Sequence, residues 1–445
     1  MHHDRLCGRE GSEHSPQVVA PWRSLLADHR FCLVLAGLVG WSAANSVLPV
    51  AESFAILRLT GSASKLGIVL ACQAAVALIV GLAGGVAGDR WSRGRILVAS
   101  AAVRMIGAAF LAVSLLMHTA SFRSLLAVCI GYGCANGFFG PVSTAVLPDV
   151  APPDRLAAAN ALTGGLSSAA TVAGPAIAGL IVAVLGPGAG FASEAALLAV
   201  TVTCLAAARI PAAEPASRAG SAGLLRQLRT GWQVYARLRW LWLLTLQWTA
   251  FSLLVLAPMS VLGPGIALRY LGGAAAWGVI SSCLTTGVVA GQFAAGRLRP
   301  RRPLLACACM CPAGAAEALA LGLGAPVAVI AAAAVLAGVA LGLQFLMLQT
   351  TMQLCVPPAV LARVAALDLI GSELGQPAGY ALAGPAAAIL GLRTFVTAAA
   401  VVCIAASAPF VLAPALRDSR ETLARIGSQT LAAAKPAEAS RQTAS

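Results

Sequence analysis

The chain has 445 residues, of which 59% are hydrophobic and only 10% are charged, and its formal net charge at pH 7 is +14. Soluble domains usually carry about a quarter charged residues, so the composition excludes an ordinary soluble protein. A large positive charge would also suit a nucleic-acid-binding protein, so the position of the basic residues has to distinguish the two.

The first 30 residues are predicted to be an N-terminal segment outside the membrane. Residues 1–20 are polar, and we expect no cleavable signal peptide among them. We expect them to be disordered or to lie outside the native protein, as a misassigned start would produce.

Twelve apolar segments follow, each close to or longer than the roughly 20 residues that a helix needs to cross a bilayer. They are rich in Ala, Leu and Val and lack the alternation of barrel strands. The sequence therefore predicts an all-α integral membrane protein. The predicted spans are 31–57, 66–88, 95–117, 122–147, 156–185, 190–210, 239–262, 273–296, 303–323, 326–352, 364–390 and 392–415.

Basic residues lie almost entirely on one side of these spans. If the N-terminus is inside, the outer loops hold only five basic residues, which are Arg58, Lys65, Arg123, Arg269 and Arg393. This asymmetry follows the positive-inside rule. It predicts that both termini are cytoplasmic, and it accounts for the charge without a nucleic-acid partner.

The chain repeats itself at a distance of 206 to 210 positions. Gly81 matches Gly287 and Gly85 matches Gly291, and an Ala-Gly-Pro-Ala stretch occurs at 173–176 and again at 383–386. We expect two six-helix halves in parallel orientation. The predicted domains are the N-terminal segment 1–30, a first half 31–210, a cytoplasmic linker 211–238, a second half 239–415 and a cytoplasmic tail 416–445.

The predicted linker contains an amphipathic pattern. Leu225, Leu228, Trp232 and Tyr235 recur at helical spacing among arginines, which indicates a helix on the membrane surface. The alternative is a plain tether without an ordered helix.

After the second span comes the stretch GGVAGDRWSRGR, residues 84–95. Its glycines allow close helix approach, and Asp89 can pair with arginines at the membrane rim. With Gly85, Asp89, Arg90 and Arg93 in place, it resembles the loop signature of the major facilitator superfamily, although Ala87, Ser92 and Gly94 depart from that signature. The resemblance implies the twelve-helix fold and a conformational latch. The alternative is that these arginines only set topology.

The fifth span contains ATVAGPAIAG, residues 170–179. Gly174, Pro175 and Gly179 resemble the antiporter motif of the same superfamily, with Ala178 in place of a glycine. The resemblance implies an exporter. Physically, a Gly-Pro pair permits a bend and tight packing against a neighbouring helix.

Most of the hydrophobic chain is similar to the drug and siderophore exporter branch, with enterobactin-exporter-like and macrolide-efflux-like members. The residues that carry this similarity are 59–67, 147–162 and 373–385. It implies proton antiport of a small drug or metabolite, a role in antibiotic resistance, a monomer, and a bacterial inner (plasma) membrane.

Ionisable residues inside the spans are expected to face a cavity, because each costs about 2.5–3.5 kcal/mol at the bilayer centre. Glu52, two turns beyond Asn45, is the first candidate for the proton carrier or cation contact; the alternative is a rim carboxylate. Glu373, near Gln376, is the second candidate. Arg104 is expected to pair with an acid or to meet an anionic substrate group.

The other polar positions in the spans have different expected roles. Asp368 is expected to fix the inner gate, and Asn136 to offer hydrogen bonds in the cavity or between helices. Glu194 and Glu317 lie near outer helix ends and are expected to be solvated.

No enzyme motif is convincing, because the chain has no G-x-x-x-x-G-K-[ST] or H-E-x-x-H, and Ser62 to Lys65 match S-x-x-K by chance. Cys307, Cys309 and Cys311 form a C-x-C-x-C run, but Cys309 should point away from the other two on a helix. We therefore expect apolar packing there, and no metal or other cofactor.

These patterns together predict a secondary transporter that exports a small amphipathic molecule in exchange for protons. Two alternatives remain open at this point. One is a proton-coupled importer with the same fold, and the other is a membrane sensor or scaffold that does not transport.

Overall fold

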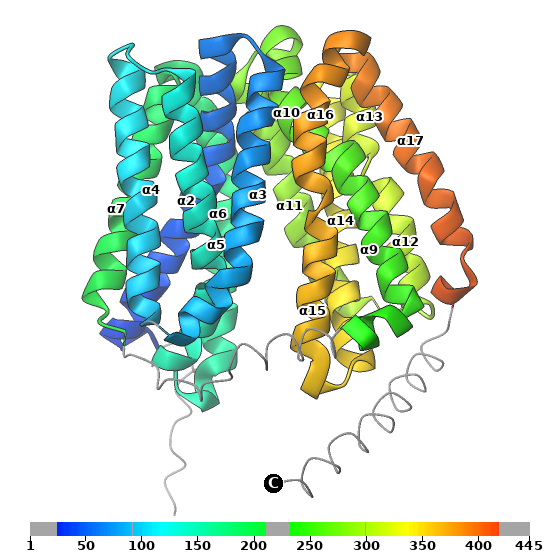
Figure 1. Ribbon diagram of the computed structural model, residues 1–445, viewed down its shortest axis with the longest axis horizontal. Coiled ribbons are helices and arrows are strands. Elements are labelled where there is room, and N and C mark those ends of the chain that lie inside the picture. Colours follow the sequence, from blue (N-terminus) through cyan, green and yellow to red (C-terminus); the bar gives the residue numbers. More distant parts are fainter. Residues whose placement is uncertain (1–24, 91, 211–231, 299, 418–445) are drawn as a thin grey trace, which may run out of the picture.

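The computed structural model describes residues 25–90, 92–210, 232–298 and 300–417, except the side chains of 82–90, 358, 359 and 362. This part of the chain is helical, with short turns between the helices and no strand (Figure 1). The all-α membrane fold predicted from the sequence is confirmed.

Six long helices make up the first half, and each runs without a break at a predicted span. Asp28 begins the first of them by accepting hydrogen bonds from backbone amides of the opening turn, and Gly61, with φ of 63°, ends it. The helices are α2 (His29–Thr60), α3 (Ala63–Arg90), α4 (Arg93–Leu116), α5 (Phe122–Val150), α6 (Leu156–Leu185) and α7 (Pro187–Ala207).

Helices of the second half are interrupted at three of its six spans. The seventh span contains two π-helical segments, Ser252–Leu256 and Ala267–Leu271, and the ninth and eleventh each break into two helices. The helices are α9 (Arg239–Phe251), α10 (Ala257–Ile266), α11 (Ala274–Arg297), α12 (Pro303–Ala313), α13 (Ala316–Gly322), α14 (Val327–Cys355), α15 (Pro358–Glu373), α16 (Gly375–Leu390) and α17 (Leu392–Leu412).

Length and apolarity are sufficient for a membrane crossing in 11 segments of the described chain. The break at Leu374 leaves α15 and α16 too short to qualify singly, and together they occupy the eleventh predicted span. The twelve predicted positions therefore all hold helices.

The bundle has two ends. Helix α2 begins and α17 ends at the same end (bottom of Figure 1), which we call the terminal face; the other end is the opposite face. Buried apolar side chains form one large cluster through the first half and the neighbouring part of the second, and a smaller cluster around Trp240 and Leu304 near the terminal face.

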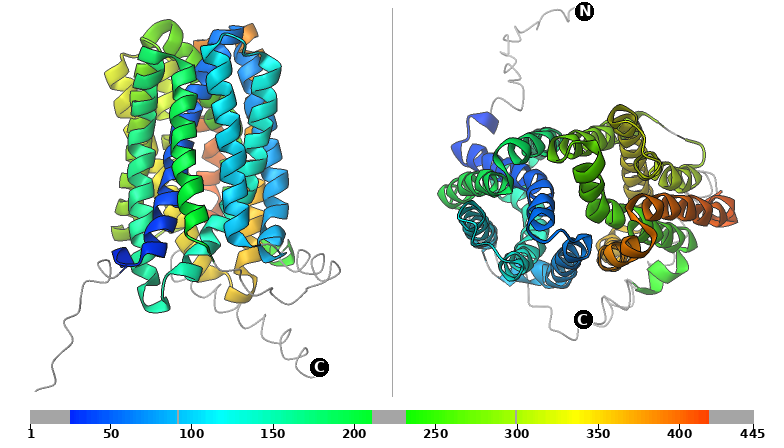
Figure 2. Two further views of the ribbon diagram at one scale, coloured as in Figure 1. Left: turned by 90° about the vertical axis from the view of Figure 1, so that its left-hand side faces the viewer. Right: turned by 90° about the horizontal axis from the view of Figure 1, so that it is seen from above.

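The two halves meet along two seams, where α6 packs on α11 and α3 packs on α16 (Figure 2). Both seams contain glycines with no room for a side chain. A Cβ on Gly278 would overlap the carbonyl of Pro175, and one on Gly384 would overlap the backbone of Ser64. These residues lie toward the opposite face, so the halves are closed together there.

Several glycines of α6 and α11 that lie nearer the terminal face have free space around them. A Cβ added to Gly164, Gly165 or Gly296 would meet no atom within 4 Å. The glycines that leave no room for a side chain between the halves, such as Gly278 and Gly384, therefore lie toward the opposite face.

Most of the predicted linker, including Leu225 and Leu228, lies outside the described residues. Residues 232–237 are helical, with Trp232 57% exposed and Tyr235 buried against the terminal end of the second half.

Candidate functional site

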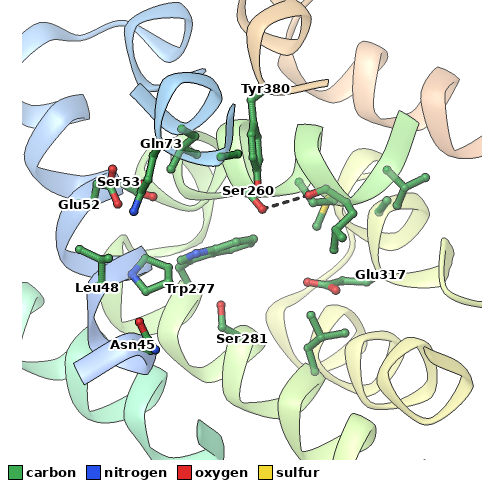
Figure 3. A pocket seen from close by; sticks show the side chains of 18 of the residues that line it. Asn45, Leu48, Glu52, Ser53, Gln73, Ser260, Trp277, Ser281, Glu317 and Tyr380 are labelled. Atoms are coloured by element: carbon green, nitrogen blue, oxygen red, sulfur yellow. Dashed lines mark hydrogen bonds between the residues drawn. The ribbon is translucent and has the colours of Figure 1, made fainter. Parts of the chain in front are cut away.

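A central cavity of about 470 Å³ lies between the halves (Figure 3). Helices α2, α3 and α5 line it from one side, and α10, α11, α13, α14 and α16 from the other. Its wall is mostly apolar. The polar side chains in the wall are Asn45, Glu52, Ser53, Gln73, Asn136, Ser260, Trp277, Ser281, Glu317 and Tyr380.

Glu52 is the acid that the first half contributes to the cavity. Its side chain is only 2% exposed, and its Oε1 atom has no hydrogen-bond partner among the described residues. The sequence predicted a cavity-lining position for Glu52, and the structure places it there.

Glu317 lies across the cavity from Glu52, and here the sequence prediction was wrong (Figure 3). The side chain was expected to be solvated near a helix end, but it is 6% exposed. The ninth span breaks between α12 and α13, and α14 and α17 cover the short α13 that carries Glu317. The second half thus also presents a carboxylate to the cavity.

Glu194 was also expected to be solvated, and it is fully buried. Its Oε1 atom accepts a hydrogen bond from Nη2 of Arg104 at 2.6 Å, and both side chains have zero exposure. Helix α7 packs along α2 and α4, so the face that carries Glu194 turns inward. The prediction that Arg104 pairs with an acid is confirmed.

Arg104 also holds two amides from neighbouring helices. Its Nη1 atom donates hydrogen bonds to Oδ1 of Asn45, on α2, and to Oδ1 of Asn136, on α5, the latter at 3.1 Å. Both asparagines line the cavity. The buried ion pair is therefore linked directly to the cavity wall.

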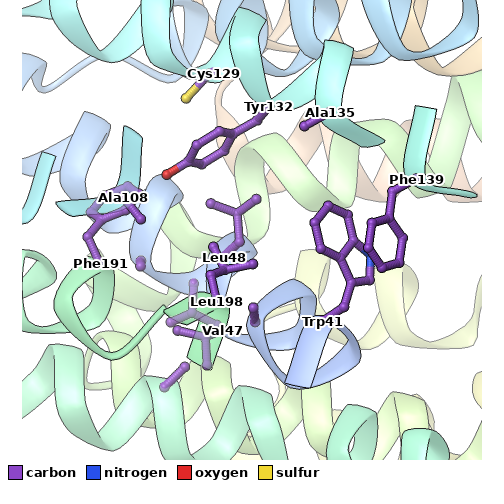
Figure 4. Packing of buried hydrophobic residues seen from close by; sticks show 14 of the residues in the cluster. Trp41, Val47, Leu48, Ala108, Cys129, Tyr132, Ala135, Phe139, Phe191 and Leu198 are labelled. Carbon is purple, nitrogen blue, oxygen red and sulfur yellow. The ribbon is translucent and has the colours of Figure 1, made fainter. Parts of the chain in front are cut away.

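Aromatic rings surround the same guanidinium. Trp41 stacks on Phe139 with ring centroids 3.6 Å apart and an interplanar angle of 6° (Figure 4). The Arg104 guanidinium lies 4.6 Å from the Trp41 ring and 5.2 Å from that of Tyr132. Cation–π attraction adds to the ion pair in fixing this side chain.

The Gly174, Pro175 and Gly179 stretch of α6 contacts both halves. Gly174 packs against Ser46 of α2, and a Cβ on Gly179 would come within 2.6 Å of the Ala274 carbonyl. The amide of Ala176 donates a hydrogen bond across the seam to Oγ of Ser282 at 2.9 Å. The residues that resemble the antiporter motif thus pack into the α6–α11 seam.

The side chains of Gly85, Asp89 and Arg90 lie outside the described residues. Arg93 is described, and it pairs with Asp149 of α5 at 2.9 Å and donates to the Ala145 carbonyl. The sequence analysis did not single out Asp149. The proline before it, in the LPDV stretch at the end of a predicted span, was a signal that could have pointed to this acid.

Asp368 binds within the second half. It accepts a hydrogen bond from Thr245 of α9, which accepts one from Tyr235 at 2.9 Å. Glu373 lies at the α15–α16 break, where Gln376 donates to it at 2.6 Å and accepts from the cavity residue Tyr380 at 3.2 Å. Glu373 therefore reaches the cavity through two other side chains.

In the C-x-C-x-C run, Cys307 and Cys311 are buried and face the carbonyls of Gln344 and Gln247, while Cys309 is partly exposed. No group of three or more His, Cys, Asp or Glu side chains that could hold a metal occurs in the described part of the chain.

Two six-helix halves that close at one end around a cavity define a membrane transporter that works by alternating access. The sequence profile of the Major Facilitator Superfamily matches residues 30–367, and the chain belongs to this family of secondary transporters. No curated protein matches it significantly.

Solved transporter structures share the fold. A bacterial homolog of the human lysosomal transporter Spinster, in an inward-facing and unoccupied conformation, is 16% identical, with a TM-score of 0.65 over 92% of this chain and 98% of its own. The nucleoside transporter NupG is 12% identical, with a TM-score of 0.67 over 85% and 99%. A POT family transporter in complex with a thioalcohol-conjugated peptide is 12% identical, with a TM-score of 0.63 over 88% and 96%.

Proposed function

We propose that this transporter exports small amphipathic cations in exchange for protons. The observation that carries the proposal is the buried Glu52 carboxyl, which lines an apolar cavity and has an oxygen without a partner. A charged carboxylate in such surroundings is costly unless a cation or a proton neutralises it. A cationic substrate and a proton can therefore exchange at this one group.

Glu317 supports the cationic character of the substrate. It adds a second acid from the other half, while the cation of Arg104 is already paired with Glu194. A mostly apolar wall with an acid on each side suits an apolar molecule that carries a positive charge.

The direction of transport rests on the resemblance of residues 170–179 to an antiporter motif and on the position of the charges. We propose that the terminal face is cytoplasmic, because among the described lysines and arginines only Arg58, Lys65, Arg123, Arg269 and Arg393 lie at the opposite face. Because the halves are packed closely together at the opposite face, we infer that the substrate enters the cavity from the cytoplasm, where an exporter loads it.

Proton release from everted membrane vesicles tests the proposal. After respiration acidifies the lumen, adding tetraphenylphosphonium should release protons through the wild-type transporter. We expect Glu52→Gln to reduce this release at least about tenfold, and Glu317→Gln to raise the half-maximal concentration about tenfold, because an interaction with a charged group is worth about 1.5–3 kcal/mol.

Asp154→Asn makes the same chemical change at an exposed loop acid and should behave as the wild type. If Glu52→Gln released protons as fully as the wild type, the proposed role of this acid would be overturned. Uptake of the cation driven by protons into intact cells would instead favour an importer, and the absence of exchange with any cation would favour a sensor or scaffold.

We also propose that Gly85, Asp89, Arg90 and Arg93 form the conformational latch that the superfamily resemblance implies. Because such a latch acts on the interconversion of states, we expect Asp89→Asn to slow proton release about tenfold or more while tetraphenylphosphonium binding stays within about twofold. Equal losses of binding and exchange in purified protein and vesicles would contradict it.

A further inference from the structure

The contact with Arg104 fixes which way two cavity amides point. A guanidinium can donate hydrogen bonds but cannot accept them. Asn45 and Asn136 both meet its Nη1 atom, so each must present its oxygen to the guanidinium, as found. The NH₂ group of each amide therefore points away from Arg104.

Neither NH₂ group has a hydrogen-bond partner among the described residues. Neither nitrogen is fully buried, so both remain accessible. Both side chains line the central cavity, Asn45 from α2 and Asn136 from α5 (Figure 3 shows Asn45). Two amide donors that share one anchor are thus available to a molecule in the cavity, and one acceptor oxygen with two lone pairs can take both.

Helical spacing relates Asn45 to Glu52, the acid of the first half. Asn45 and Glu52 are seven residues apart on α2, which puts them on one helix face about 10 Å apart along the axis. Leu48 and Pro49 form the apolar wall between them. Along this face a ligand meets amide donors, an apolar stretch and then a carboxylate.

We propose that Asn45 and Asn136, oriented by Arg104, form an acceptor-binding subsite that selects cationic amphiphiles with a hydrogen-bond acceptor about 10 Å from the charge. The preferred substrates then carry a ketone, amide, ester or ether oxygen at that distance. The cationic end of such a ligand rests on the proposed function. Its acceptor end rests on the contacts of Asn45 and Asn136 with Arg104.

A matched pair of probes tests the subsite. Decyltrimethylammonium has a cation and no acceptor, and its partner carries one ketone in place of the methylene about 10 Å from the nitrogen. Binding of both to the purified full-length transporter is measured calorimetrically. We expect the wild type to prefer the ketone by about two- to tenfold, as one or two net hydrogen bonds allow.

Asn45→Leu and Asn136→Leu should each reduce this preference toward one. Arg104→Lys should also reduce it, because one ammonium is not a planar fork that can hold both amides and Glu194. Asn160→Leu is the matched control, since that amide binds its own helix at the Leu156 carbonyl, and it should keep the preference. The ratio is measured within one preparation, so partial loss of folded protein does not affect it.

Equal binding of the two probes by the wild type would overturn the subsite and leave the proposed function intact. A preference that survives both asparagine variants would also overturn it. If neither probe binds, the cationic substrate of the proposed function fails first, and the subsite for such substrates fails with it.

Discussion

Arg104→Met should lower the free energy of unfolding by about 3–5 kcal/mol, the usual cost of removing one partner of a buried ion pair. The substitution leaves Glu194 with zero exposure and without its cation, and it removes the donor that holds two cavity amides. Most of the cost comes from the uncompensated charge. The measurement is the temperature at which half of the folded protein is lost in detergent, together with its abundance in membranes.

The double variant Arg104→Met with Glu194→Leu separates charge from packing. Because it removes both charges and keeps apolar volume, we expect it to recover more than half of the loss. A double variant as unstable as Arg104→Met alone would show that the ion pair is not the reason for the loss.

Gly384→Val should prevent the opposite face from closing and reduce transport at least about tenfold. Any Cβ at Gly384 would overlap the backbone of Ser64, and a backbone cannot move aside as a flexible side chain can. The clash exists only where α3 and α16 are in contact, so the variant should fold and favour the state in which the opposite face is open.

The separation of the halves at the opposite face is measured with spin labels at Thr60 and Leu390. These are the residues with which α2 and α16 end at that face. The wild type should show a population with a short distance between the labels, and Gly384→Val should lose it. Gly164→Val is the control, because a Cβ at this position of α6 would meet nothing within 4 Å. An unchanged short-distance population in Gly384→Val would contradict the assignment of this seam as the closing contact.

Hydropathy and the internal repeat predicted the helices, because a helix that crosses a membrane needs length and apolarity, and both are local properties. The interruptions were not predicted. The sequence shows Pro312 and Gly314 in the ninth span, but many prolines in these helices, such as Pro175, leave the helix continuous. Whether a proline breaks a helix depends on which neighbours satisfy the freed backbone groups.

The cavity acids were predicted only in part. Depth along a helix is readable from the sequence, and it correctly placed Glu52 inside. It failed for Glu194 and Glu317, because position near a helix end does not tell which face another helix covers. The partner of Arg104 depends on the packing of α7 against α4, which pairs residues 90 positions apart.

The helix breaks lie in the second half of the described chain, so the two halves differ in stiffness. The first half has unbroken helices joined by the buried Arg104–Glu194 ion pair. The 206-residue offset of the glycine repeat puts Met310 where the first half has Arg104, and the 210-residue offset of the Ala-Gly-Pro-Ala repeat puts Ile404 where it has Glu194. The second half has π-helical segments and split helices instead, and such irregular points are where helices bend most easily. The first half is then the stiffer of the two, and the second half is the one that bends more easily. We expect the deformation that accompanies each transport cycle to be concentrated in α9–α10, α12–α13 and α15–α16.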